Sequence, residues 1–128
     1  MTNHVMKPSD ENDFFEMSLS TLEKYYEAMN NNDLEGTLSM IHSTSPTQLP
    51  TRQILGKLMH AYKLKTELIE TKFIGSDNGY ICIRMTQKTT KVEGPDFKDN
   101  ITDSLVAMKH DEKVWKIWSM MPLETKFI

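Results

Sequence analysis

Residues 114–121 read Val-Trp-Lys-Ile-Trp-Ser-Met-Met, and this stretch near the end of the chain decides the fold. Side chains of a β-strand alternate between its two faces, so Trp115 and Ile117 point one way while Trp118 and Met120 point the other. Both faces of this predicted last strand are therefore apolar. A sheet with helices on one side needs only one apolar face, so something else must cover the second.

The strand before it repeats the pattern at residues 105–108, which read Leu-Val-Ala-Met. Two arrangements explain this without a partner chain: helices that reach both faces, or a bulge that reverses the alternation. We favour a homodimer interface on the outer face, because large exposed apolar patches usually mark partner surfaces. The residues expected in it are Trp118, Met120 and Met108.

Working back along the chain, a period of two predicts three earlier strands at about 66–74, 80–90 and 98–109. Turn clusters at 75–79 and 93–96 and a short connection at 110–112 separate the four strands. Consecutive strands with short connections form an antiparallel meander. The second half of the chain is therefore predicted to be one sheet.

Before residue 64 the apolar residues recur every three or four positions, which is the helical period. Asp13 can cap a first helix, Asp33 a second, and Pro50 or Thr51 can open a third. Their apolar faces comprise Phe15, Leu19, Leu22, Tyr26 and Met29, then Leu34, Leu38 and Ile41, then Ile54, Leu55, Leu58, Met59 and Tyr62. The predicted fold class is α+β, with N-terminal amphipathic helices packed on a curved, mainly four-stranded antiparallel sheet.

Length and composition fit a single domain over residues 13–128, preceded by a polar, disordered tail over residues 1–12. The formal net charge of -3 and the scattered cations argue against a nucleic-acid partner. Cys82 is the single cysteine, so it has no disulfide partner within the chain. The start of the sequence lacks the apolar core of a signal peptide, and no stretch is long and apolar enough for a membrane span. We expect a cytoplasmic protein without a membrane partner.

The order of these elements resembles the nuclear transport factor 2-like, or SnoaL-like, superfamily, which shares a cystatin-like, cone-shaped α+β barrel. The likeness covers roughly residues 14–121 and is carried by residues 25–29, 32–34, 97–100 and 114–119. The resemblance implies a frequent homodimer through the outer sheet face and a cavity between helices and sheet. One departure is the link at residues 43–49, which is too short for the hairpin that many members place there.

Catalytic members of that superfamily imply a carboxylate facing a phenol in an apolar cavity. The candidates here are Asp103 for the carboxylate, Tyr26 or Tyr25 for the phenol, and His42 near the cavity mouth. The simpler interpretation is that Asp103 is solvated and the tyrosines belong to the core. Residues expected to line a pocket are Tyr25, Tyr26, Met29, Met59, Met85 and Trp115. No spacing typical of a metal or nucleotide site occurs, so we expect no metal and no cofactor.

The sequence therefore favours a homodimeric, non-catalytic domain of the SnoaL-like type that binds a small molecule or assembles with a partner. The alternative is a cofactor-independent isomerase, dehydratase or hydrolase acting on a small apolar substrate in the cone cavity. Fold-level resemblance alone does not choose between them.

Overall fold

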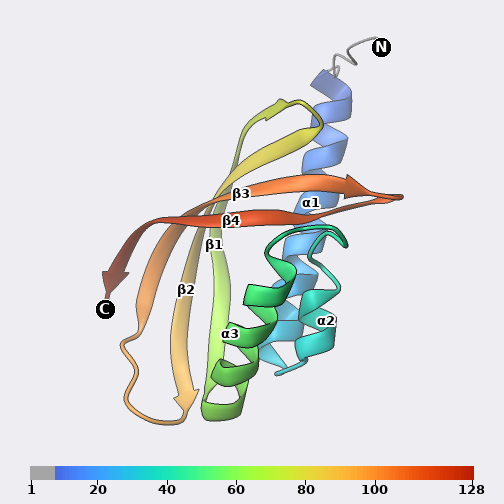
Figure 1. Ribbon diagram of the computed structural model, residues 1–128. Helices are drawn as coiled ribbons and strands as arrows, with labels where there is room; N and C mark the ends of the chain where they lie inside the picture. The colour runs from blue at the N-terminus through green and yellow to red at the C-terminus, as the bar shows by residue number, and fades with distance from the viewer. Residues whose placement is uncertain (1–7) are drawn as a thin grey trace.

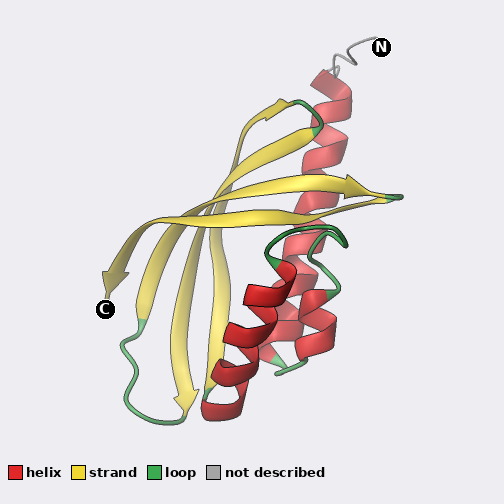
Figure 2. Cartoon of the chain, in the orientation of Figure 1, coloured by secondary structure: helices red, strands yellow, loops and turns green. Residues whose placement is uncertain are grey.

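Three helices are followed by four long strands, in the order that the sequence predicts (Figure 1). The computed structural model describes residues 8–128. The helices are α1 (Pro8–Asn30), α2 (Leu34–Leu38) and α3 (Gln48–Ala61), and the strands are β1 (Lys63–Asp77), β2 (Tyr80–Glu93), β3 (Asn100–Asp111) and β4 (Val114–Phe127). Neighbouring strands pair antiparallel in the order β1-β2-β3-β4, which is the predicted meander (Figure 2).

Helix α1 begins at Pro8 rather than at the predicted cap, Asp13. Proline is well tolerated in the first turn of a helix, and acidic residues near that turn interact favourably with the positive end of the helix dipole. The polar segment before Asp13 can therefore form the start of α1. Residues 8–12 are therefore helical and not part of a disordered tail. The rest of the predicted tail, residues 1–7, lies outside the described residues.

The two shorter helices differ from the prediction at their ends. Asp33 caps α2 as expected, with its Oδ1 accepting a hydrogen bond from the Gly36 N–H at 2.9 Å. The helix stops at Leu38, however, and Ile41 forms a parallel bridge with Ile117 of β4 instead of lying on the helix. Helix α3 turns Ile54 outward, where 60% of its surface is exposed, so its buried face is narrower than predicted.

The core lies between α1 and one face of the sheet, and all three helices are on that side (Figure 1). Leu22 and Tyr26 of α1 are buried as predicted. In the first half of β2 and in most of β3 every second residue is buried, as in the series Ile81, Ile83 and Met85 of β2. Burial of these apolar side chains is the main stabilising term. In the described part of the chain, no helix covers the other face of the sheet.

A β-bulge in β4 decides which side chains reach that outer face. Ala107 pairs with Ser119 and Met108 with Ile117, so Trp118 is the extra residue of the bulge. The bulge reverses the alternation, as one of the sequence alternatives allowed. Met120 therefore lies opposite the buried Val106, and Met108 is itself 0% exposed. The prediction that Met108 and Met120 belong to an outer interface is wrong, while Trp118 does lie on the outer face.

Candidate functional site

Tyr26 is the principal polar residue on the concave side of the sheet. Its hydroxyl donates a hydrogen bond to Oε1 of Gln87 on β2 and also lies 3.5 Å from the sulfur of Met85. Burial, followed by the nearby phenol of Tyr25, raises the pKa of Tyr26 well above its ordinary value. Burial alone raises the pKa of Tyr25 to about 12. Both phenols are therefore neutral near pH 7, and the amide partner of Tyr26 cannot act as a base.

Asp103 lies on the opposite face of the sheet from Tyr26. Its Oδ1 accepts a hydrogen bond from the Thr86 hydroxyl at 2.6 Å, and its Oδ2 accepts one from the Arg84 guanidinium at 3.1 Å. These two bonds, with Thr86 the larger cause, lower the pKa of Asp103. As predicted, Asp103 and Leu105 lie on the same face of β3, but that face is the outer one. Asp103 and Tyr26 are therefore not brought together.

His42 lies just beyond α2 and is 6% exposed. Its Nδ1 is 3.1 Å from the Thr44 backbone N–H, and its Nε2 is 3.1 Å from the carbonyl oxygen of His110. Since an N–H can only donate and a carbonyl can only accept, Nδ1 is the acceptor and Nε2 carries the proton. The Nδ1 bond lies within the loop after α2, and the Nε2 bond holds that loop against the end of β3.

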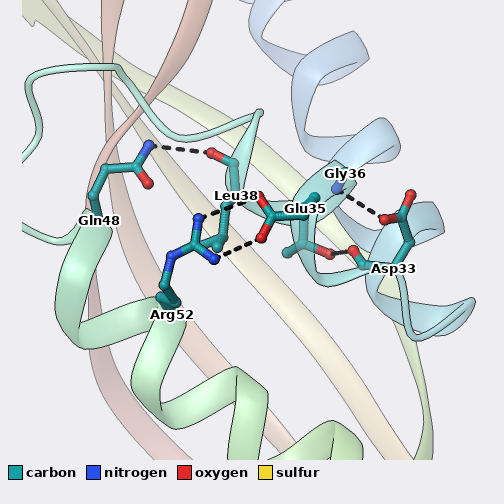
Figure 3. A network of polar contacts seen from close by, with 7 residues as sticks. Asp33, Glu35, Gly36, Leu38, Gln48 and Arg52 are labelled. Carbon is teal, nitrogen blue, oxygen red and sulfur yellow. Dashed lines mark hydrogen bonds and ion pairs between the residues drawn. The ribbon is translucent and has the colours of Figure 1, made fainter.

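The short link between α2 and α3 is fastened to the edge of β4. Besides the Ile41–Ile117 bridge, the Ser45 hydroxyl donates to the carbonyl of Trp118 at 2.6 Å. Figure 3 shows the other side of this link, where the Gln48 side chain donates to the Leu38 carbonyl at 3.2 Å. These hydrogen bonds hold the link against the edge of β4.

Two of the six residues predicted to line a pocket, Met29 and Met59, border the same small hollow. Met29 comes from α1 and Met59 from α3, and they meet there together with Leu55, Leu58, Tyr62 and Leu64. The enclosed volume is about 30 Å³, which is room for about one water molecule and well below the roughly 300 Å³ at which ligand pockets begin. The remaining predicted pocket residues Tyr25, Met85 and Trp115 are 7%, 0% and 3% exposed and pack in the core instead.

The outer sheet face carries a partly exposed cluster of aromatic and aliphatic side chains. The Lys109 ammonium lies 4.4 Å from the ring centre of Trp118 and 5.4 Å from that of Tyr80. Leu105 and Met121 face each other across β3 and β4, and Met121 is 54% exposed. We call Tyr80, Cys82, Leu105, Ala107, Trp118 and Met121 the outer patch.

A groove that the sequence did not indicate runs between α1 and the edge of β1. Its volume is about 370 Å³, and it is lined by Glu23, Tyr26, Glu27, Asn30, Asn31 and Leu68. The pair Glu23 and Glu27, four residues apart on one helix, was the available signal for a charged wall.

Two classes of site are not indicated among residues 8–128. No group of three or more His, Cys, Asp or Glu side chains is placed to hold a metal ion within this range. No helix in the same range is long and apolar enough to cross a membrane.

The sequence of the chain matches one protein family. The profile of the anti-sigma-I factor RsgI9 C-terminal domain aligns with residues 20–128. The chain belongs to this family. No curated protein sequence gives a significant match to this chain.

Solved structures with the same fold confirm the nuclear transport factor 2-like resemblance. A proposed aromatic ring hydroxylase from Novosphingobium aromaticivorans superimposes with a TM-score of 0.73 and 11% identity, over 96% of each chain. The beta subunit of benzoate 1,2-dioxygenase from Burkholderia mallei gives 0.68 and 9%, over 97% of this chain and 93% of the other. A proposed dehydratase of the nuclear transport factor 2-like family from Streptomyces avermitilis gives 0.67 and 14%, over 92% and 99%. At these identities the likeness shows the fold, α+β with a curved antiparallel sheet, and not a shared activity.

Proposed function

We propose that the chain is a non-catalytic assembly domain that forms a homodimer through the outer face of its sheet. The observation that carries this proposal is the outer patch, which no helix within residues 8–128 covers although Leu105, Trp118 and Met121 lie on it. Apolar side chains gathered on one uncovered face are typical of a partner surface. The predicted small-molecule role has less support, because the methionine-lined pocket encloses only about 30 Å³.

The charges beside the outer patch suit pairing with a second copy. The Arg84–Asp103 ion pair lies next to Leu105, with Glu70 and Lys72 in the same cleft. In a two-fold interface, away from the symmetry axis, residue i of one copy contacts residue j of the other and residue j contacts residue i. A face with both cations and carboxylates around an apolar centre can therefore complement itself.

The enzyme alternative lacks its acid–base pair in the described residues. Tyr26 is hydrogen-bonded to an amide, and Asp103 lies on the outer face with its own partners. The family is named for the C-terminal domain of an anti-sigma-I factor and not for an enzyme. The solved structures named for a hydroxylase and a dehydratase share the fold at 11% and 14% identity.

Light scattering coupled to size-exclusion chromatography tests the dimer. The chain should elute with twice its 14.9 kDa mass at tens of micromolar. Met121→Glu places a charge in the outer patch and should give a monomer, and it should still fold because Met121 is already exposed. Ile54→Glu is the matched control, since Ile54 is equally exposed but lies on α3. A monomeric parent chain, or a dimer unaffected by Met121→Glu, would contradict the proposal.

A further inference from the structure

The edge of β1 is covered at one residue by a side chain that imitates a neighbouring strand. Asn30, the last residue of α1, donates from Nδ2 to the Thr66 carbonyl at 2.8 Å. It also accepts the Thr66 N–H on Oδ1 at 2.7 Å. A side-chain amide has the donor and acceptor of a peptide group. Asn30 therefore makes the pair of bonds that a fifth strand would make at this position.

This pairing shows which backbone groups of β1 point away from the sheet. Thr66 turns its N–H and C=O toward Asn30, and residues two apart in an antiparallel strand turn these groups to the same side. The register is regular from Thr66 to Leu68, so Leu68 also presents its N–H and C=O outward. Within residues 8–128, no side chain and no backbone group outside the β1–β2 ladder makes a hydrogen bond to these two groups of Leu68, in contrast to Thr66. The strand edge is open there.

The open edge faces the groove between α1 and β1. Leu68 lines the groove from the sheet side, and Glu23 and Glu27 line it from the helix side. The groove has a volume of about 370 Å³ and is widely open to solvent. The lining contains two carboxylates and no cation, and the nearby Lys63 ammonium already donates to the Asn30 carbonyl. The groove thus combines a strand edge with a negative wall.

We propose that this groove binds an extended peptide segment carrying a lysine or arginine, which pairs with β1 at Leu68. The peptide backbone bonds to the open N–H and C=O of Leu68, and so extends the sheet beyond the position that Asn30 occupies. Its basic side chain meets Glu23 and Glu27, which lie on one face of α1 because they are four residues apart. This site goes beyond the proposed dimer, because it lies on the edge of β1 and not on the outer patch.

Titration of the ¹⁵N-labelled chain with a short peptide tests the site. The probe is the capped pentapeptide Thr-Val-Lys-Val-Thr, and the readout is the amide shift of Leu68 together with the side-chain amide of Asn30. We expect the largest shifts at these two residues. Replacing the lysine by glutamate, or N-methylating the peptide groups that face β1, should each weaken binding at least about tenfold. Binding that persists after N-methylation, or no shift at Leu68, would overturn the proposal.

Variants of the chain separate the charge from the strand edge and from the dimer. Glu23→Gln with Glu27→Gln should weaken binding of the lysine peptide about fivefold or more, since both carboxylates face the groove. Glu16→Gln on the same helix is exposed but does not line the groove, and it should leave the affinity unchanged. Met121→Glu should also bind the peptide normally, so failure of the dimer does not affect this test. Shifts at Leu68 that grow with protein concentration alone would identify a second copy as the occupant and overturn the peptide proposal.

Discussion

The environment of Tyr26 indicates whether the interior of the protein is structural or catalytic. The Tyr26 hydroxyl donates to a neutral partner, the side-chain amide of Gln87, which cannot act as a general base. The sequence predicted that Tyr26 is buried, because its helical spacing places it with Leu22. It could not identify Gln87 as the partner, since the two residues are far apart along the chain and meet only through the sheet.

Removing the Tyr26 hydroxyl should destabilise the fold. Tyr26→Phe leaves the Gln87 oxygen without its donor in a part-buried position, so the free energy of unfolding should fall by about 1–2 kcal/mol. Tyr25→Phe is the matched control, because no hydrogen bond within residues 8–128 involves the Tyr25 hydroxyl. Urea unfolding followed by tryptophan fluorescence measures both. Equal losses for the two variants would show that the bond to Gln87 contributes nothing.

The same two phenols predict a loss of stability in alkali. The pKa of Tyr25 is about 12 in the fold, against an ordinary value of 10.0. Between these values the unfolded chain releases its proton while the folded chain keeps it, so rising pH favours unfolding. The contribution is intact below pH 10 and should fall by roughly 1.4 kcal/mol by pH 11. Urea unfolding at pH 9 and pH 11 should therefore show a smaller pH effect for Tyr25→Phe than for the parent chain, by about that amount. An identical pH effect in the two chains would refute the buried-phenol argument.

For Asp103, the sequence predicted which residues share its face of the strand but not which face of the sheet is buried. Its parity with Leu105 followed from strand alternation, but alternation alone does not say which of the two faces is buried. The buried set turned out to be the other one, which includes Thr102 and Ser104. Because these two buried residues are polar, the sequence of β3 does not show that their face is the buried one.

At the scale of elements, the order and type of the helices and strands were predictable, and their ends were not. Strand β4 continues to Phe127, beyond the predicted end at Met121, and passes through Pro122. Proline is tolerated on an edge strand, where a missing N–H costs no ladder bond, and β4 is an edge. A bulge was one of the alternatives that the sequence allowed, but its position at Trp118 could not be predicted. That position depends on how β4 pairs with β3 and with the link after α2.

The connection between β2 and β3 depends on one glycine. Gly94 has φ +126°, and a Cβ there would lie 2.8 Å from the Ala61 carbonyl oxygen and 2.8 Å from Cδ1 of Tyr62. Gly94→Ala should therefore lower the free energy of unfolding by about 2–3 kcal/mol, by straining the backbone and pushing on the end of α3. Gly75→Ala, with nothing within 4 Å of its Cβ, should change it by less than about 1 kcal/mol. Thermal unfolding of both variants measures the difference, and a Gly94→Ala protein as stable as Gly75→Ala would contradict the clash.

At the scale of the whole molecule, the helices within residues 8–128 lie on one face of the sheet (Figure 1), and the outer patch is on the other face. The sequence predicted this one-sided arrangement from the two apolar faces of residues 114–121, although the bulge removed two of the three residues assigned to the interface. The groove beside β1 could not be predicted, because it depends on where the end of α1 meets the strand edge.

If a second copy covers the outer patch, folding and association are coupled. A partner that binds only the folded chain raises its apparent stability by mass action, so the unfolding temperature should rise as protein concentration increases from about 1 to about 100 μM. Met121→Glu should remove this dependence and unfold at the low-concentration temperature of the parent chain, because it disrupts the interface without disturbing the core. Ile54→Glu should keep the dependence, since its side chain projects from α3 away from the sheet face. Differential scanning calorimetry over this range measures all three proteins. An unfolding temperature of the parent chain that stays constant over this range would contradict the proposed dimer through the outer patch.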